Sequence, residues 1–268
     1  MSGRILAAAL LVGLAGCSGT RTTVEPTASS SALPPALEGK RLLAAGDVDS
    51  AVVVLTRALR EDSTDNGIRG DLAFARYQRV LQSDTADRRA LVADAYDAYA
   101  DLEARGNTEM LVYDRLCELA QSVGDTAGFL QASSRAVERY PYDRQFFNLG
   151  SAQLAAQRYR EVIESQKEAI ERFRDSPYLS GFYRLLGQAY IRVDRYQTAQ
   201  KVLADGVHEA DRTHAAIEGS GGDMTVLQRI DLDRMAMLQS LERLYTIYDE
   251  QEKLKEVQDR LKRAGRPL

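Results

Sequence analysis

Residues 187–207 read GQAYIRVDRYQTAQKVLADGV, and residues 150–170 read GSAQLAAQRYREVIESQKEAI. Both stretches begin with a glycine that a tyrosine follows nine residues later, Tyr196 in the first and Tyr159 in the second. Their starting positions, 187 and 150, set a repeat of about 37 residues. From residue 36 onward, apolar residues recur every three or four positions, which is the period of amphipathic helices. The sequence therefore predicts an all-α chain built from repeated pairs of helices.

The spacing within these copies resembles the tetratricopeptide repeat (TPR), a helix–turn–helix unit of about 34 residues. The family places large and small residues at set sites, which the best copy fills with Tyr183, Leu186, Gly187, Tyr190, Tyr196, Ala199, Leu203 and Gly206. Small residues let the two helices of a pair approach closely, and a single pair cannot bury its apolar face alone. The resemblance covers 36–265 and implies an all-α TPR solenoid of about five to six helix–turn–helix units.

Three segments within the domain at 36–268 depart from the best copies. Residues 66–106 predict two helices that fit the family pattern poorly, as a divergent copy. Residues 209–225, EADRTHAAIEGSGGDMT, hold three glycines and are interpreted as an insertion that forms a loop, either a plain linker or the place of a function. The charged segment 250–267, EQEKLKEVQDRLKRAGRP, predicts a C-terminal capping helix that solvates the end of the array.

The start of the chain predicts export. Residues 1–16 combine Arg4 with a short apolar run, the layout of a secretory signal peptide. The sequence LAGC at 14–17 resembles the lipobox of bacterial lipoprotein precursors, which implies that residues 1–16 are removed and that Cys17 carries a diacylglycerol anchor with its fatty-acid chains. The alternative is a signal that merely ends in cysteine. Residues 17–35 are rich in Ser, Thr and Pro and predict a flexible tether.

The residue types and their spacing predict a protein that is not an enzyme and that carries no cofactor and no metal. A formal charge of −4 argues against a nucleic-acid partner. His208 and His214 are six residues apart, so on one helix they would not share a face. Cys117 falls at a small-residue site of the copy at 110–141, which favours a buried packing residue over a nucleophile.

The remaining function class is recognition of another protein. In the TPR family the first helix of each pair lines a groove, and carrying its groove sites over gives Arg144, Phe147, Leu154, Arg184, Gln188 and Arg192. Arg184, Gln188 and Arg192 follow one another at four-residue steps and would form a polar stripe for a peptide carboxylate. An ordinary solvated face is the alternative for the stripe, and Phe147 could instead face the neighbouring repeat.

Together these patterns predict a membrane-anchored scaffold or adaptor for other proteins of the bacterial cell envelope. The resemblance to small envelope lipoproteins of this class implies a role in pilus, secretion or outer-membrane assembly, with the protein on the outer membrane facing the periplasm if the cell has two membranes. The alternative is a lipoprotein that captures a small solute, which would need a closed apolar pocket.

Overall fold

The computed structural model describes residues 33–83 and 87–265. The signal peptide predicted at 1–16, the anchor at Cys17 and most of the tether at 17–35 lie outside these residues. By its internal contacts the chain divides into Met1–Pro34 and a compact unit, Pro35–Leu268, and the fold below is that of the second unit. None of the helices that the structure describes is long and apolar enough to cross a membrane.

The described part of the compact unit is built from helices alone, without a strand. In chain order they are α1 (Pro35–Ala44), α2 (Val48–Glu61), α3 (Asn66–Gln82), α4 (Arg88–Ala104), α5 (Met110–Val123), α6 (Thr126–Arg139), α7 (Asp143–Ala155), α8 (Tyr159–Arg172), α9 (Leu179–Arg192), α10 (Tyr196–Gly219), α11 (Met224–Ile247) and α12 (Gln251–Ala264).

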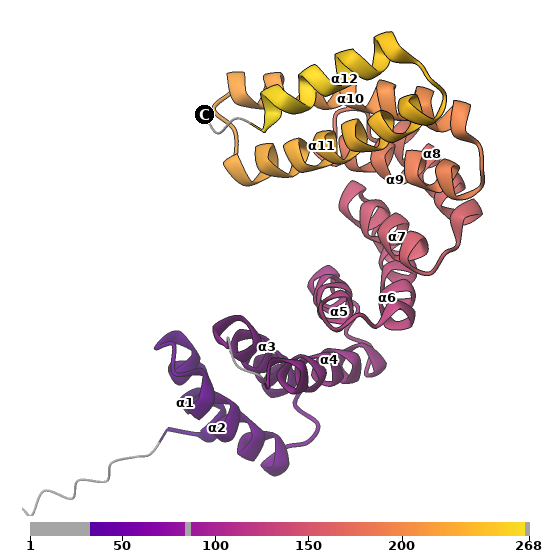
Figure 1. Ribbon diagram of the computed structural model, residues 1–268. Coiled ribbons are helices and arrows are strands. Elements are labelled where there is room, and N and C mark those ends of the chain that lie inside the picture. Colours follow the sequence, from indigo (N-terminus) through magenta and orange to yellow (C-terminus); the bar gives the residue numbers. More distant parts are fainter. Residues whose placement is uncertain (1–32, 84–86, 266–268) are drawn as a thin grey trace, which may run out of the picture. The chain divides into compact units, whose positions relative to one another are not determined.

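These helices form six successive pairs, from α1 with α2 to α11 with α12 (Figure 1). Each helix packs against the next one in the chain, and first helices of neighbouring pairs also touch, α1 on α3, α7 on α9 and α9 on α11. The predicted repeat architecture is therefore confirmed. It includes the divergent copy at 66–106, which is the pair α3 and α4.

In the five pairs other than α3 with α4, the turn between the two helices contains one residue with a left-handed backbone. Glycine supplies it in two early pairs, with φ of 78° at Gly46 and 74° at Gly124. In the last three pairs a non-glycine residue takes the same conformation, with φ of 60° at Gln157, 58° at Asp194 and 52° at Asp249. A left-handed residue with a Cβ stores about 1–2 kcal/mol of strain.

The two helices of a pair meet where a glycine faces a large side chain. A Cβ atom placed on Gly187 would lie 2.3 Å from Cδ2 of Leu203, and one on Gly39 would lie 2.5 Å from Cδ2 of Leu55. Gly150 faces the side chain of Gln166 in the same way. The close approach of the two helices in these three pairs therefore rests on a glycine in the first helix, as the repeat pattern predicted.

In the pair α5 and α6, the first helix contributes the larger side chain at this contact and the second helix contributes the smaller one. Cys117 replaces the glycine, and Ser133 takes the place of the large residue, with Sγ and Oγ 3.4 Å apart. Both side chains are buried, and burial raises the pKa of the Cys117 thiol to about 11. The thiol therefore stays protonated at neutral pH, as expected for a packing residue.

The prediction of a loop at 209–225 is wrong. Helix α10 continues to Gly219 and α11 begins at Met224, so only residues 220–223 connect them. The segment is helical because Ala210 is fully buried and Ile217 packs against the same core cluster, which gives the extension an apolar side of its own. His208 and His214 consequently lie on α10 rather than around a loop.

Candidate partner-binding face

The candidate face is formed by the first helices of the pairs, α1, α3, α5, α7, α9 and α11, and we call it the first-helix face. The six residues predicted for recognition lie on two of these helices, which pack against each other. Three come from α7 and three from α9, namely Arg144, Phe147, Leu154, Arg184, Gln188 and Arg192. The structure thus brings the predicted residues together, and their contacts decide which of them a partner could reach.

Arg184 is bonded to the next repeat. Its Nε donates to Oδ1 of Asp233 on α11 at 2.5 Å, and Ser180 Oγ donates to the other carboxylate oxygen at 3.1 Å. The Asp233 side chain is 7% exposed and that of Arg184 is 20% exposed. A carboxylate this deeply buried needs its cationic partner. Arg184 therefore ties α9 to α11, although its Nη1 also reaches Gln188 Oε1 at 3.4 Å.

Phe147 and Leu154 fill the contact between α7 and α9. The Phe147 ring lies 5.3 Å from the Tyr178 ring, centroid to centroid. It also covers Gly181, where a Cβ would approach the ring to 2.5 Å. Leu154 packs beside a buried cluster that includes Leu185 of α9. The alternative that Phe147 faces the neighbouring repeat is the one that the structure supports.

Arg144 and Arg192 reach the surface. Nη1 of Arg144 lies 3.3 Å from Oδ2 of Asp114 on α5, with half of its side chain exposed. Asp114 is buried and also accepts a hydrogen bond from Gln145 Nε2 at 3.1 Å. Arg192 is exposed and has no ion pair among the residues that the structure describes. Of the predicted stripe, Arg192 and part of Gln188 remain for a partner.

Similar contacts join the earlier first helices. Lys40 on α1 lies 3.3 Å from Asp71 on α3. Between α3 and α5, the Arg115 guanidinium stacks 4.0 Å above the Tyr77 ring, whose hydroxyl donates to Glu118 at 2.7 Å. Burial and the neighbouring Glu118 carboxylate raise the pKa of Tyr77 to about 12, which keeps that donor protonated. Each neighbouring pair of first helices is thus joined by a polar or aromatic contact.

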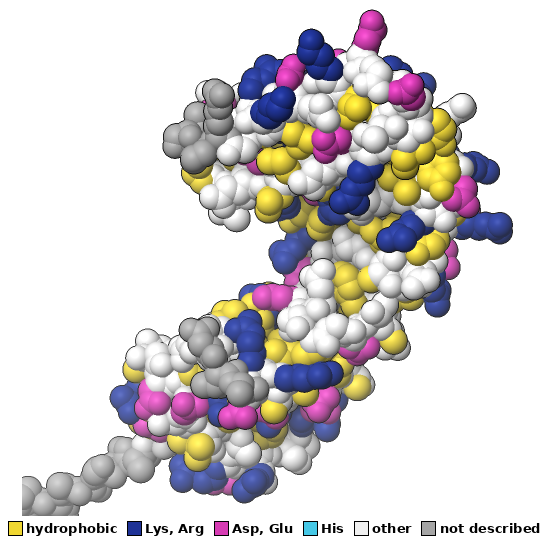
Figure 2. All heavy atoms as spheres, viewed as in Figure 1, with side chains coloured by type: hydrophobic (Ala, Val, Ile, Leu, Met, Phe, Trp, Pro, Cys, Tyr) yellow, Lys and Arg dark blue, Asp and Glu magenta, His cyan; other side chains and the backbone are white. Residues whose placement is uncertain are grey.

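Apolar side chains that the sequence reasoning missed are exposed on the same helices. Leu37 of α1, Phe74 of α3 and Leu111 of α5 expose 50%, 41% and 49% of their surface. Phe74 lies between Ala73 and Ala75, which are buried in two different core clusters. The two alanines are buried in different directions, which leaves Phe74 facing outward, and these directions are visible only in the structure. Figure 2 shows apolar side chains interspersed with charged ones on the surface in view.

The polar clusters offer no metal site within 33–83 and 87–265, where no group of three or more His, Cys, Asp or Glu side chains is placed to hold an ion. His214 Nε2 lies 3.5 Å from Asp231 Oδ1 and its Nδ1 lies 3.7 Å from Glu218 Oε2, and Asp231 is itself paired with Arg234. The predictions that the chain is not an enzyme and needs no cofactor stay predictions.

The comparisons with known proteins concern the fold. No protein-family model matches the chain, and no curated protein matches its sequence. Among solved structures, a crystal structure of MamA protein is 16% identical, covering 65% of this chain and 88% of that chain, with a TM-score of 0.52. MamA from Desulfovibrio magneticus RS-1 is 15% identical, covering 65% and 92%, with a TM-score of 0.50. PilF of Pseudomonas aeruginosa is 16% identical over 86% and 90%, with a TM-score of 0.48.

MamA is a TPR-type protein, and a likeness at this identity shows the fold alone. Together with the six helix pairs, it shows that the compact unit is a TPR solenoid.

Proposed function

We propose that this chain is a protein-interaction scaffold of the bacterial cell envelope and that a partner binds to the first-helix face. The observation that carries the proposal is the exposure of Leu37, Phe74 and Leu111 on three successive first helices. Single exposed apolar residues are ordinary, whereas exposed apolar residues that recur on successive first helices favour an interaction site. The contacts between neighbouring first helices hold this face in place, which lowers the entropy lost on binding.

The proposal includes a lipid anchor at Cys17. Its support is the sequence alone, the LAGC box at 14–17 after a short apolar run with a basic start. Two or three acyl chains on Cys17 would hold the protein on a membrane, since a single chain binds only marginally. Envelope proteins are the partners that this location would supply, and pilus, secretion or outer-membrane assembly is the setting that we propose.

The alternative of a solute-binding lipoprotein requires a closed apolar pocket. A cleft of about 540 Å³ at α10–α12 is lined mainly by charged side chains, among them Asp211, Arg234 and Arg260. No feature of the described residues favours solute capture over protein binding.

The recognition proposal is tested by placing a photo-crosslinking amino acid at Phe74, at Leu111 or, as a control, at Val53 of the second helix α2. Val53 is 70% exposed, so the control position is at least as accessible as the other two. We expect one and the same envelope protein to be crosslinked in intact cells from both first-helix positions and not from Val53. Equal crosslinking from Val53 would refute a partner on the first-helix face.

The anchor is tested separately by Cys17→Ala and labelling of cells with a radioactive fatty acid. We expect the label to be lost and the protein to leave the membrane fraction or to remain unprocessed. Label on the Cys17→Ala protein would end the anchor proposal and leave the recognition proposal standing.

A further inference from the structure

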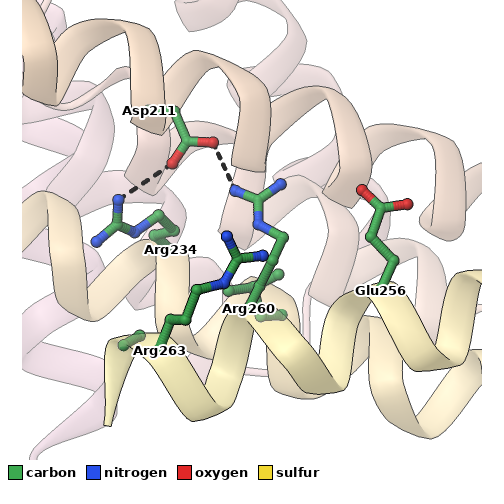
Figure 3. Close-up of a pocket in the computed structure, with 7 residues that line it drawn as sticks. Asp211, Arg234, Glu256, Arg260 and Arg263 are labelled. Atoms are coloured by element: carbon green, nitrogen blue, oxygen red, sulfur yellow. Dashed lines mark hydrogen bonds and ion pairs between the residues drawn. The ribbon is translucent and has the colours of Figure 1, made fainter. Parts of the chain in front are cut away.

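Helices α10, α11 and α12 enclose a cleft of about 540 Å³ that lies outside the first-helix positions discussed above. Its lining holds three arginine side chains, Arg234 of α11 and Arg260 and Arg263 of α12, as Figure 3 shows. Leu238, which is 2% exposed, adds an apolar part to the wall. Three guanidinium groups in one cleft repel one another unless anions lie between them.

One carboxylate of the chain already binds two of these arginines. Asp211 of α10 accepts from Arg234 Nη1 through Oδ1 at 3.1 Å and from Arg260 Nη2 through Oδ2 (Figure 3). The side chains of Arg234 and Arg260 are 25% and 28% exposed, so their positions are fixed by packing as well as by Asp211. Arg234 has a second carboxylate partner in Asp231, with Nη2 and Oδ1 2.6 Å apart.

Arg263 differs from the other two arginines. Its Nε donates to the backbone oxygen of Asp259 at 3.2 Å, and its Nη atoms have no partner among the described residues. In Figure 3 its guanidinium group lies beside that of Arg260 and faces the cleft. The cleft therefore offers unused N–H donors next to a pair of arginines that already holds a carboxylate.

We infer that this cleft binds a carboxylate of an acidic peptide segment, seated between Arg260 and Arg263. Asp211 provides the template, because it shows that a carboxylate fits between two guanidinium groups of this cleft. Planar guanidinium groups bind carboxylates through paired N–H donors. A cleft of this volume lies in the range of ordinary ligand sites and has room for a few residues.

Glu256 limits where the acidic group can bind. It lines the same cleft one helical turn before Arg260, and Figure 3 shows it apart from the three arginines. An acidic peptide is therefore expected to place its carboxylate at the end of the cleft formed by Arg263. The cleft involves none of Leu37, Phe74 and Leu111, on which the proposed function rests, so failure of this inference would leave the scaffold proposal unaffected.

The test is a titration of the full chain in detergent micelles, in which NMR follows the arginine Nε–Hε signals. One probe is acetyl-Asp-Glu-Asp-amide, which has side-chain carboxylates only, and the other is acetyl-Gly-Gly-Ala with a free C-terminal carboxylate. We expect at least one of them to shift the signals of Arg260 and Arg263, and the stronger probe identifies the kind of carboxylate that is bound. No shift with either probe, or an equal shift with acetyl-Asn-Gln-Asn-amide, would overturn the inference.

The variants separate this site from general charge effects. Arg263→Gln should weaken binding at least tenfold, whereas the matched charge change Arg243→Gln, at an exposed position of α11, should leave it unchanged. Asp211→Asn should act in the opposite direction and tighten binding, because it removes a competing carboxylate while its amide oxygen still accepts a hydrogen bond. Equal affinity of Arg263→Gln and wild type would refute the site.

Inorganic phosphate and phosphatidylglycerol vesicles complete the set of probes. We expect both to bind more weakly than the better peptide, because the Asp211 template is a planar carboxylate. Tighter binding of phosphate or of the vesicles would show a general anion site or a membrane contact, and would overturn the peptide assignment.

Discussion

Replacing Gly187 by alanine should destabilise the solenoid, although alanine is the better helix former. A methyl carbon at Gly187 would lie 2.3 Å from Cδ2 and 2.5 Å from Cγ of Leu203, whereas carbon atoms in contact are about 3.5–4.0 Å apart. Leu203 is fully buried. Relief of the contact therefore requires α9 and α10 to separate or Leu203 to leave its rotamer.

The net effect is the difference between two terms. Overpacking a core contact costs about 1–3 kcal/mol, and Gly→Ala inside a helix gains about 1 kcal/mol of helix propensity. We expect Gly187→Ala to lower the free energy of unfolding by about 1 kcal/mol, and by up to about 2 kcal/mol if the helices cannot move. Gly187→Leu adds more volume at the same point and should destabilise further.

The matched control is Gly70→Ala on α3. A Cβ atom on Gly70 would meet no atom within 4 Å, so only the propensity term acts there. Gly70→Ala should raise stability by about 0.5–1 kcal/mol, with a sign opposite to that of Gly187→Ala. Leu203→Ala should lose part of its damage when combined with Gly187→Ala, because the added methyl group enters the space that the leucine leaves.

The assay is urea unfolding followed by circular dichroism, in which a change of 1 kcal/mol moves the midpoint by about 0.3–1 M. The chain should remain helical in all variants before the transition. If Gly187→Ala is as stable as Gly70→Ala, the close approach of α9 and α10 does not limit the packing, and the reasoning from the small-residue sites fails.

Three further predictions concern single residues. Asp233→Asn should lower the free energy of unfolding by about 1–3 kcal/mol in the same assay, because the partly buried Arg184 loses its carboxylate partner while keeping some access to water. An unchanged free energy of unfolding would mean that the Arg184–Asp233 pair contributes nothing to stability. Gln157→Gly should raise stability by about 0.5–1 kcal/mol, because glycine relieves the left-handed backbone at φ 60°, and an unchanged midpoint would refute the strain. In the Cys17→Ala protein, Cys117 should resist an aromatic disulfide reagent until the chain unfolds, and fast labelling at neutral pH would contradict this. Stability should fall as pH rises from 9 towards 11, because the unfolded thiol, with a pKa near 9.0, ionises before the folded one.

The sequence predicted the pairing of helices well because the pairing depends on local spacing. Gly187 and Leu203, or Gly39 and Leu55, are 16 residues apart in each pair, so their contact is visible as a period along the chain. The loop expected at 209–225 failed for a related reason. Its three glycines indicated a loop, whereas Ala210 and Ile217, seven residues apart, continue the apolar side of α10.

The candidate site was predictable in its position and not in its contacts. Arg184 and Phe147 lie on the first helices that the repeat pattern assigned to them, α9 and α7. Their partners, Asp233 and Tyr178, come from other repeats, and Asp233 is 49 residues from Arg184. No spacing rule of a single repeat reaches across that separation, so the sequence could not show that the two side chains are already engaged.

This engagement changes how the first-helix face can be tested for binding. Arg184→Glu would set a second carboxylate against the buried Asp233, and lost capture of a partner would then report local unfolding as much as lost recognition. Arg192 lies two turns further along α9, is exposed and has no ion pair among the described residues, so Arg192→Glu changes the charge of the face without that conflict. The contacts that stiffen the array and the side chains free to meet a partner are thus different residues on the same helices. A variant that is folded and fails to capture its partner is informative only when it comes from the second group.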